Sequence, residues 1–155
     1  MAQSIFNAEQ FENTQVTEAT STERIYADEN EYPAVIDKYE FRPGTSKDGR
    51  PYLFVDVHWS LDSPEQRARM QREKVIVRQS FGLQQTEQGG LATGKGINVE
   101  LGLLRDAVGQ NQNGMPWTFK QLLGQVAKVK VKHRDFVTNT GEPGKNAEVV
   151  AVTKL

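Results

Sequence analysis

The sequence contains no cysteine among its 155 residues. This absence excludes disulfide bonds, thiolate nucleophiles and metal sites with cysteine ligands. Only two histidines are present, His58 and His133, and neither has carboxylates at a recognisable metal-binding spacing. We therefore expect no metal and no cofactor, and we interpret both histidines as ordinary surface or half-buried residues.

Long apolar runs are also absent. No run approaches the roughly 18 residues that span a bilayer. The opening stretch MAQSIFNAEQFENTQ has neither the basic start nor the apolar segment of a signal peptide. With 37% hydrophobic and 25% charged residues, the composition is ordinary for one globular domain. We expect a soluble, cytoplasmic protein that makes no membrane contact.

Net charge is nearly absent overall, at −1, but the two parts of the chain differ in sign. Residues 1–31 carry one base, Arg24, and a net charge of −6, whereas residues 32–155 carry +5. We predict an acidic, flexible N-terminal arm over 1–31 and a folded domain over 32–155. A cationic domain favours anionic partners. The arm could be attracted to that domain, although a simple solvating role fits its polar composition better.

Alternating apolar residues, rich in Val, Ile, Tyr and Phe, predict five β-strands. Turn dipeptides at Pro43-Gly44 and Asp48-Gly49 predict a hairpin between the first two strands. In the third strand, Gly82 suggests a bend or bulge. The predicted strands cover 33–42, 51–60, 73–84, 125–137 and 147–155.

Helical spacing of apolar residues predicts one helix over 97–110, with Asn98 as its N-cap and Gly109 at its end. A short helical turn is expected over 117–124, and a basic loop or short helix over 61–73. Three strands, a helix, a short turn and two strands form the order of a five-stranded OB barrel, with its helix between strands three and four. The predicted fold class is therefore mainly β, an OB-like barrel.

Cations occupy every second position of the fourth predicted strand, at Lys128, Lys130, Lys132 and Arg134, and alternate with Ala127, Val129 and Val131. Alternate side chains of a strand stand about 6.6 to 6.8 Å apart, comparable to successive phosphates of a stretched nucleic-acid strand. The cations could bind phosphates. They could equally protect an exposed sheet edge from aggregation.

Aromatic residues on the first two strands favour the phosphate interpretation, because single-strand binders combine basic grooves with rings that stack on bases. We predict stacking by Tyr52, Phe54 and Tyr39. Tyr52 and Phe54 share a strand face with the polar residues Asp56 and His58, which favours exposure of the two rings, and we interpret Asp56 as solvated. Three other rings are expected to have structural roles. Phe41 and Trp59 are assigned to the core, and Trp117 is expected to fix the helical turn on the barrel. Additional phosphate contacts are predicted at Arg78, Lys47, Arg50 and Lys95.

Catalytic patterns are weak. GGLATGKG at 89–96 nearly matches a phosphate-binding loop, but Gly96 stands where a magnesium-binding hydroxyl is required. The spacing of Asp56 and Asp62 fits no two-metal pattern. No serine lies in a nucleophile elbow. We therefore predict that the protein is not an enzyme.

The segments KYEFRPGTSKDGRPYLFVDVHW, LGLLRDAVG, PWTFKQLLGQVAKVKVKHR and TGEPGKNAEVVAV together span most of 33–153. In the order of these segments and in their residue composition, this chain resembles phage-encoded OB-fold single-stranded-DNA-binding and recombination accessory proteins. That resemblance implies binding of single-stranded DNA during phage replication or recombination, in the cytoplasm of the bacterial host and without catalysis.

One departure from bacterial single-strand binders concerns the acidic segment. Those proteins carry an acidic partner-recruiting tail at the C-terminus, whereas this sequence ends in VTKL and places its acidic residues first. The arm could recruit replication or recombination proteins from the other end. The alternative function is a β-barrel virion or assembly protein whose arm contacts neighbouring subunits, and homo-oligomers are compatible with either function.

Overall fold

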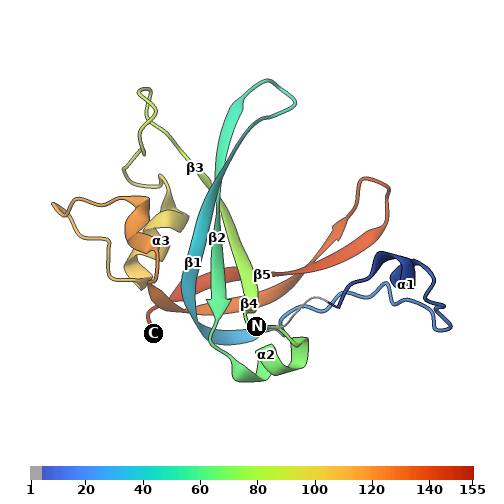
Figure 1. The fold of residues 1–155 in the computed structure, drawn as a ribbon. Coiled ribbons are helices and arrows are strands. Elements are labelled where there is room, and N and C mark those ends of the chain that lie inside the picture. The colour runs from blue at the N-terminus through green and yellow to red at the C-terminus, as the bar shows by residue number, and fades with distance from the viewer. Residues whose placement is uncertain (1–4) are drawn as a thin grey trace.

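The computed structural model describes residues 5–155 and forms a closed barrel with the strand order β1–β2–β3–β5–β4 (Figure 1). β4 returns to pair with β1, and every pairing is antiparallel except that of β3 with β5. This is the predicted OB-like barrel. Its strands are β1 (Asn30–Thr45), β2 (Pro51–Leu61), β3 (Ile76–Leu83), β4 (Val126–Val137) and β5 (Pro143–Thr153).

Helices fill the connections where the sequence predicted them. The main helix, α3 (Val99–Ala107), lies between β3 and β4, and the predicted short turn is a 3-10 helix, η1 (Phe119–Leu122). The basic connection between β2 and β3 forms α2 (Pro64–Met70), which begins after Ser63, whose Oγ accepts a hydrogen bond from the Gln66 N–H. A further short helix, α1 (Ala8–Glu12), lies in the N-terminal arm and buries no residue.

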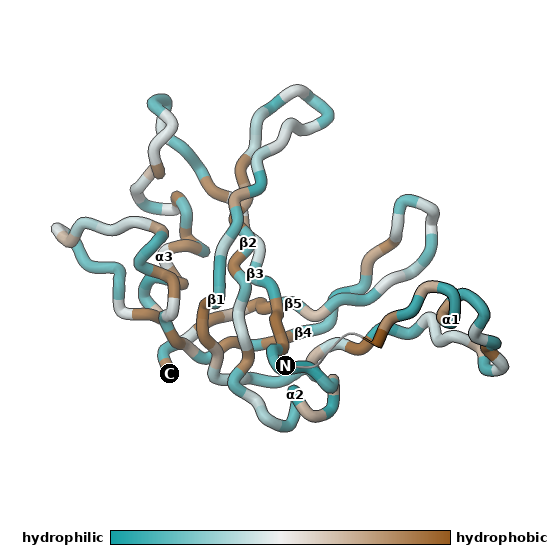
Figure 2. The backbone as a smooth tube through the Cα atoms, in the orientation of Figure 1, coloured by the Kyte–Doolittle hydropathy of each residue, from teal (hydrophilic) through white to brown (hydrophobic). Residues whose placement is uncertain are grey.

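The core lies inside the barrel and extends under α3. Trp59 is fully buried, as predicted, and its Nε1–H donates to Gln79 Oε1 at 3.0 Å. Leu101 and Leu104 of α3 and Leu122 of η1 belong to the same core cluster. Apolar residues gather where the strands pack together, whereas the hairpin turns are polar (Figure 2). The inward faces of the strands therefore account for the alternating pattern in the sequence.

Two hairpins extend beyond the barrel in different directions (Figure 1). The β1–β2 hairpin turns at residues 46–50, and the β4–β5 hairpin turns at residues 138–142.

None of the helices within residues 5–155 has the length and apolar character needed to span a membrane.

Several local expectations were wrong. The pairing of β3 with β2 runs through Gly82 without a register shift, and the shifts fall instead between Ile36 and Lys38 and beside Lys130. Asn98 is the N-cap residue of α3, as predicted, but its side chain makes no capping hydrogen bond to the helix. Its side chain bonds to the backbone of Gln84 and Ala92 and so closes the glycine-rich loop ahead of the helix.

Two side chains have the opposite burial to that expected. Asp56 was interpreted as solvated, but it is only 4% exposed because Arg42 and Ser80 cover and bond its carboxylate. Phe41 was assigned to the core but is 47% exposed. It faces the inner side of β1, where that strand leaves the barrel, so the core covers it only in part.

Candidate nucleic-acid interface

The outward-facing side chains of β1, β2 and β3 form one continuous surface, which we call the outer face. Val55, Val57 and Trp59 of β2 point into the core, so the alternate residues of β2 point outward. Cross-strand neighbours share a face of the sheet. The register therefore places these outward residues beside Lys38, Glu40 and Arg42 of β1 and beside Arg78, Ser80 and Gly82 of β3.

Tyr52 and Phe54 form an aromatic pair on the outer face. Their ring centroids are 5.7 Å apart with the planes at 81°, and Tyr52 is 42% exposed. Each ring lies against a glycine of the neighbouring strand. A Cβ added at Gly44 would lie 2.3 Å from Tyr52 Cζ, and one added at Gly82 would lie 3.8 Å from Phe54 Cζ. Glycine at position 44 is therefore what allows the Tyr52 ring to lie against β1.

Arg42 is held beside this pair by the buried Asp56. Its Nε and Nη2 donate to the two Asp56 carboxylate oxygens at 3.1 and 3.2 Å, and Ser80 Oγ donates to Oδ1 at 2.6 Å. The Arg42 guanidinium lies 5.0 Å from the centroid of Phe54. These hydrogen bonds, that from Arg42 first, hold the pKa of Asp56 below its usual range. Because the Arg42 side chain remains 52% exposed, it is both oriented and accessible.

A second row of the outer face holds Lys38, His58 and Arg78, which lie opposite one another on β1, β2 and β3. Arg78 is exposed, and no ion pair joins it to another residue in the part of the chain that the structure describes. His58 Nε2 is buried and has no hydrogen-bond partner among residues 5–155. The row continues past Arg78 to Glu148 of β5 and then to Lys132 of β4.

The cations of β4 alternate with fully buried residues, since Ala127, Val129 and Val131 are all 0% exposed, as predicted. They lie on the outside of β4, and only Lys132 lies in line with Arg78 of the outer face. Lys128 pairs with Glu31 at 3.4 Å, and Arg134 pairs with Glu148 at 3.4 Å. The structure therefore separates the four cations into different surroundings.

The edge-protection interpretation is wrong for Lys128 and Lys130. β4 pairs with β1 through residues 126–131 on one side and with β5 on the other, so neither lysine stands on a free edge. Closure of the barrel removes that edge. Their charge therefore needs another explanation.

Tyr39 does not join Tyr52 and Phe54. It lies opposite the buried Val57 and so faces the inner side of β1, where its ring contacts Phe41 at 5.5 Å and Phe119 at 5.8 Å. Trp117 packs on Phe119 at 5.0 Å and so ties the segment around η1 to β1, the role that the sequence predicted for it. These rings form an aromatic cluster apart from the outer face.

The remaining predicted cations lie on exposed loops. Lys47 and Arg50 occupy the turn of the β1–β2 hairpin, and Lys95 lies in the glycine-rich loop between β3 and α3. Among the described residues, no cation–π contact joins any of the three to Tyr52 or Phe54. Within residues 5–155, no group of three or more acidic or histidine side chains is placed to hold a metal ion.

Sequence reasoning missed Arg42 and Ser80. Both positions follow from the pairing register, because Arg42 lies opposite Phe54 and Ser80 lies opposite Asp56. A predicted hairpin with the correct turn would have placed Arg42 beside Phe54.

No protein-family model matches this sequence, and no curated protein matches it either.

Proposed function

We propose that this protein binds single-stranded DNA without strong sequence preference, through the outer face of β1, β2 and β3. The observation that carries the proposal is the aromatic pair Tyr52 and Phe54, with Arg42 fixed over the Phe54 ring. Rings provide stacking that every base can use, and an oriented guanidinium can pair with a phosphate. The OB-like barrel supports the same conclusion, because such barrels bind oligonucleotides on the face of strands two and three.

Each residue has a defined part in the proposed mechanism. Tyr52 and Phe54 stack on successive bases, and Arg42 offers the phosphate the N–H groups that Asp56 does not use, including both of those on Nη1. Arg78 and Lys132 extend the positive surface across β3 and β4, while Lys47 and Arg50 supply cations at the hairpin turn. No step breaks or forms a covalent bond, so the proposed role is binding, during phage DNA replication or recombination in the bacterial cytoplasm.

The experiment is a titration of labelled oligo-dT with the full chain, followed by fluorescence anisotropy at two salt concentrations with duplex DNA as competitor. We expect binding that duplex does not displace and that weakens with salt, with a slope of about −0.7 per phosphate contact. Phe54→Ala should lower the affinity at least about five-fold, since one stacked base contributes roughly 1 to 3 kcal/mol. Phe119→Ala, which changes the aromatic cluster away from the outer face, is the matched control.

Absence of binding at low salt would overturn the proposal and leave the assembly alternative. Duplex that competes as well as single strand would replace it with general binding to polyanions. An equal loss of affinity in Phe54→Ala and Phe119→Ala, with both variants folded, would remove the outer face from the mechanism.

A further inference from the structure

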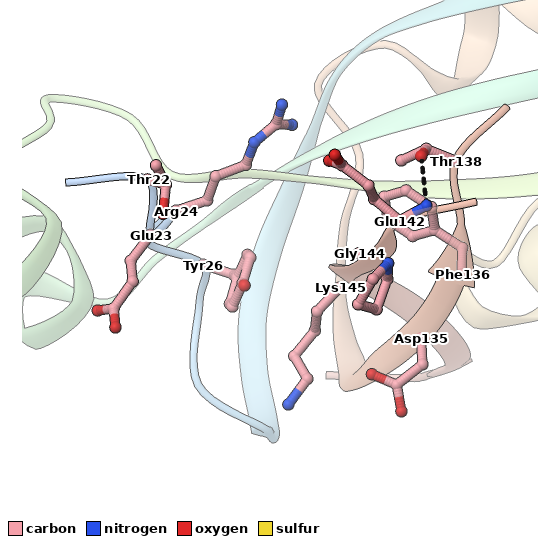
Figure 3. Close-up of a pocket in the computed structure, with 11 residues that line it drawn as sticks. Thr22, Glu23, Arg24, Tyr26, Asp135, Phe136, Thr138, Glu142, Gly144 and Lys145 are labelled. Atoms are coloured by element: carbon pink, nitrogen blue, oxygen red, sulfur yellow. Dashed lines mark hydrogen bonds between the residues drawn. The ribbon is translucent and has the colours of Figure 1, made fainter. Parts of the chain in front are cut away.

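A groove lies where β3 and β5 separate. These strands pair only at Arg78 and Glu148. Beyond this point a groove of about 630 Å³ lies between the end of the arm, the loop after α2, β3 and the β4–β5 hairpin. We call it the seam groove, and its lining includes Arg24, Arg72, Arg78, Lys145, Tyr26 and Phe136. A second cavity of about 720 Å³ continues from it along the hairpin (Figure 3).

Four cations converge on the seam groove from four separate segments, and Glu23 is the one carboxylate among the described residues that line it. No ion pair or side-chain hydrogen bond joins Arg24, Arg72, Arg78 or Lys145 to any other described residue. By contrast, the arginines of the neighbouring α2 are used internally, since Arg67 pairs with Asp62 and Arg69 with Asp28. Positive charge therefore exceeds negative charge among the residues that line the groove.

The part of the N-terminal arm that lines this groove is held in place by hydrogen bonds to residues 26–28, just after Arg24. Arg69 donates to the Tyr26 carbonyl, and His133 Nε2–H donates to the Ala27 carbonyl at 2.7 Å. Gln66 Nε2 donates to the Asp28 carboxylate at 2.8 Å. The end of the arm is thus part of the folded surface, and it holds the Arg24 backbone near the hairpin.

Placement of Arg24 is informative because it is the one basic residue among residues 1–31. Its side chain and that of Glu23 leave the arm in opposite directions (Figure 3). An acidic arm thus adds its single cation to a groove that already holds three cations, two from barrel strands and one from the loop after α2. Like charges gathered without partners repel one another, and an anion between them relieves that repulsion.

The lining is aromatic as well as cationic. Phe136 is 43% exposed and lies opposite Gly144, whose missing Cβ leaves room for the ring, since an added Cβ would lie 2.5 Å from Phe136 Cζ. Tyr26 provides a second ring at the groove. Cations for a phosphate and rings for a base together match a nucleotide. A volume of this size is typical of sites for small organic ligands.

We infer that the seam groove holds a nucleotide of the bound single strand, beyond those on the outer face. Its phosphate lies among Arg24, Arg72, Arg78 and Lys145, and its base lies against Phe136. This inference rests on the proposed function. Arg78 belongs to both the outer face and the groove, so one strand can pass from the first to the second without leaving the protein.

The test compares the full chain with the triple variant Arg24→Gln, Arg72→Gln, Lys145→Gln and with each single variant. Lys120→Gln, another exposed and unpaired lysine outside the groove, is the control for loss of charge. We expect the triple variant to bind a 15-mer of oligo-dT about ten-fold more weakly at low salt, with the salt slope reduced by roughly 0.7, the value for the one phosphate contact in the groove. Oligo-dT carrying 5-iododeoxyuridine should crosslink on irradiation to Phe136 or Tyr26, with the site mapped by mass spectrometry.

The outcomes separate the two proposals. If the unmodified chain binds no oligo-dT, the proposed function itself fails. If it binds, and the folded triple variant keeps the same affinity and salt slope as Lys120→Gln, the seam groove is excluded while the outer face stands. Weaker binding in the triple variant, absent in Lys120→Gln and accompanied by the crosslink, supports the groove.

Discussion

At the scale of single residues, the outer face depends on one buried carboxylate. Asp56 orients Arg42, and Arg42 in turn lies over Phe54, so a buried carboxylate sets the position of the guanidinium that is proposed to pair with a phosphate. Burying a charged carboxylate destabilises the folded state unless the carboxylate accepts hydrogen bonds, and here Arg42 and Ser80 donate them. The same residue therefore supports both the stability of the barrel and the proposed binding surface.

Asp56→Asn should lower the free energy of unfolding at neutral pH by roughly 1 to 3 kcal/mol, because it removes a charged partner from a buried hydrogen-bond network. The pKa of Asp56 is lower in the folded protein than in the unfolded chain, where it is about 4. The ionised Asp56 therefore contributes its full stabilisation of the folded state above pH 4, and this contribution is lost as the pH falls through the pKa of the folded state. Urea unfolding between pH 2 and 7 should thus show a shallower acid loss in the variant. Glu87→Gln, an exposed carboxylate in the loop after β3 that no ion pair joins to another described residue, is the control, and equal acid loss in Asp56→Asn and the unmodified chain would contradict the assignment.

Gly44→Ala tests the placement of a ring. The added Cβ would meet the end of the Tyr52 side chain, which can move, so we expect a small change in stability and a displaced ring. Affinity for oligo-dT should fall several-fold, because a stacked base contributes about 1 to 3 kcal/mol. Gly82→Ala is the matched control, since its Cβ makes only ordinary contact with Phe54. Unchanged affinity in Gly44→Ala would remove Tyr52 from the interface.

At the scale of secondary-structure elements, β4 shows that one alternating pattern can serve several environments. Lys128 is paired with Glu31 and lies beside Pro33 of β1, whereas Lys132 lies beside Glu148 and in line with Arg78. The alternation itself reports only which side chains point outward. Which part of the outside they reach is decided by barrel closure.

Lys132→Gln should therefore weaken binding of oligo-dT more than Lys128→Gln. We expect a loss of a few-fold and a salt slope smaller by roughly 0.7 for Lys132→Gln, because it removes one phosphate contact. Lys128→Gln should change little, since its ammonium already pairs with Glu31. Anisotropy over a range of salt concentrations measures both quantities. Equal effects at the two positions would indicate a diffuse electrostatic contribution instead of a defined path.

The fold was predictable from sequence because its signals are local. Alternation predicted five strands, and Gly109, with a φ of +72°, ends α3 as expected. The contacts of the site were less predictable, since they depend on register and closure. Pairing Arg42 with Asp56 requires the β1–β2 register, and the exposure of Phe41 depends on where the barrel stops covering β1. Residues 24, 72, 78 and 145 meet only in the folded barrel.

At the scale of the whole molecule, the acidic arm has two parts with different relations to the barrel. Residues 5–25 are all exposed, whereas Ala27 is buried and Glu29 accepts a hydrogen bond from the His133 N–H at 2.8 Å. That hydrogen bond is the main reason that the pKa of Glu29 is lowered, and nearby Lys132 adds to it. The anchored part thus shapes the seam groove, while the exposed part adds negative charge close to a surface proposed to bind DNA.

Removal of residues 1–22 should therefore strengthen binding. The truncation deletes three acidic residues, Glu9, Glu12 and Glu18, and no basic one, so the net charge rises from −1 to +2 while Arg24 remains. Because residues 5–22 bury nothing, the melting temperature should stay close to that of the full chain. Affinity for oligo-dT should increase several-fold at low salt and converge with that of the full chain at high salt, where screening shortens the range of the arm's charge.

A full-length chain with glutamine at positions 9, 12 and 18 separates charge from chain length. If charge is the cause, this variant should bind as tightly as the truncated protein. If only the truncation strengthens binding, the arm obstructs the strand by its bulk. Weaker binding after truncation would contradict both explanations and show that the exposed part of the arm contacts the DNA itself, which would extend the path proposed through the seam groove.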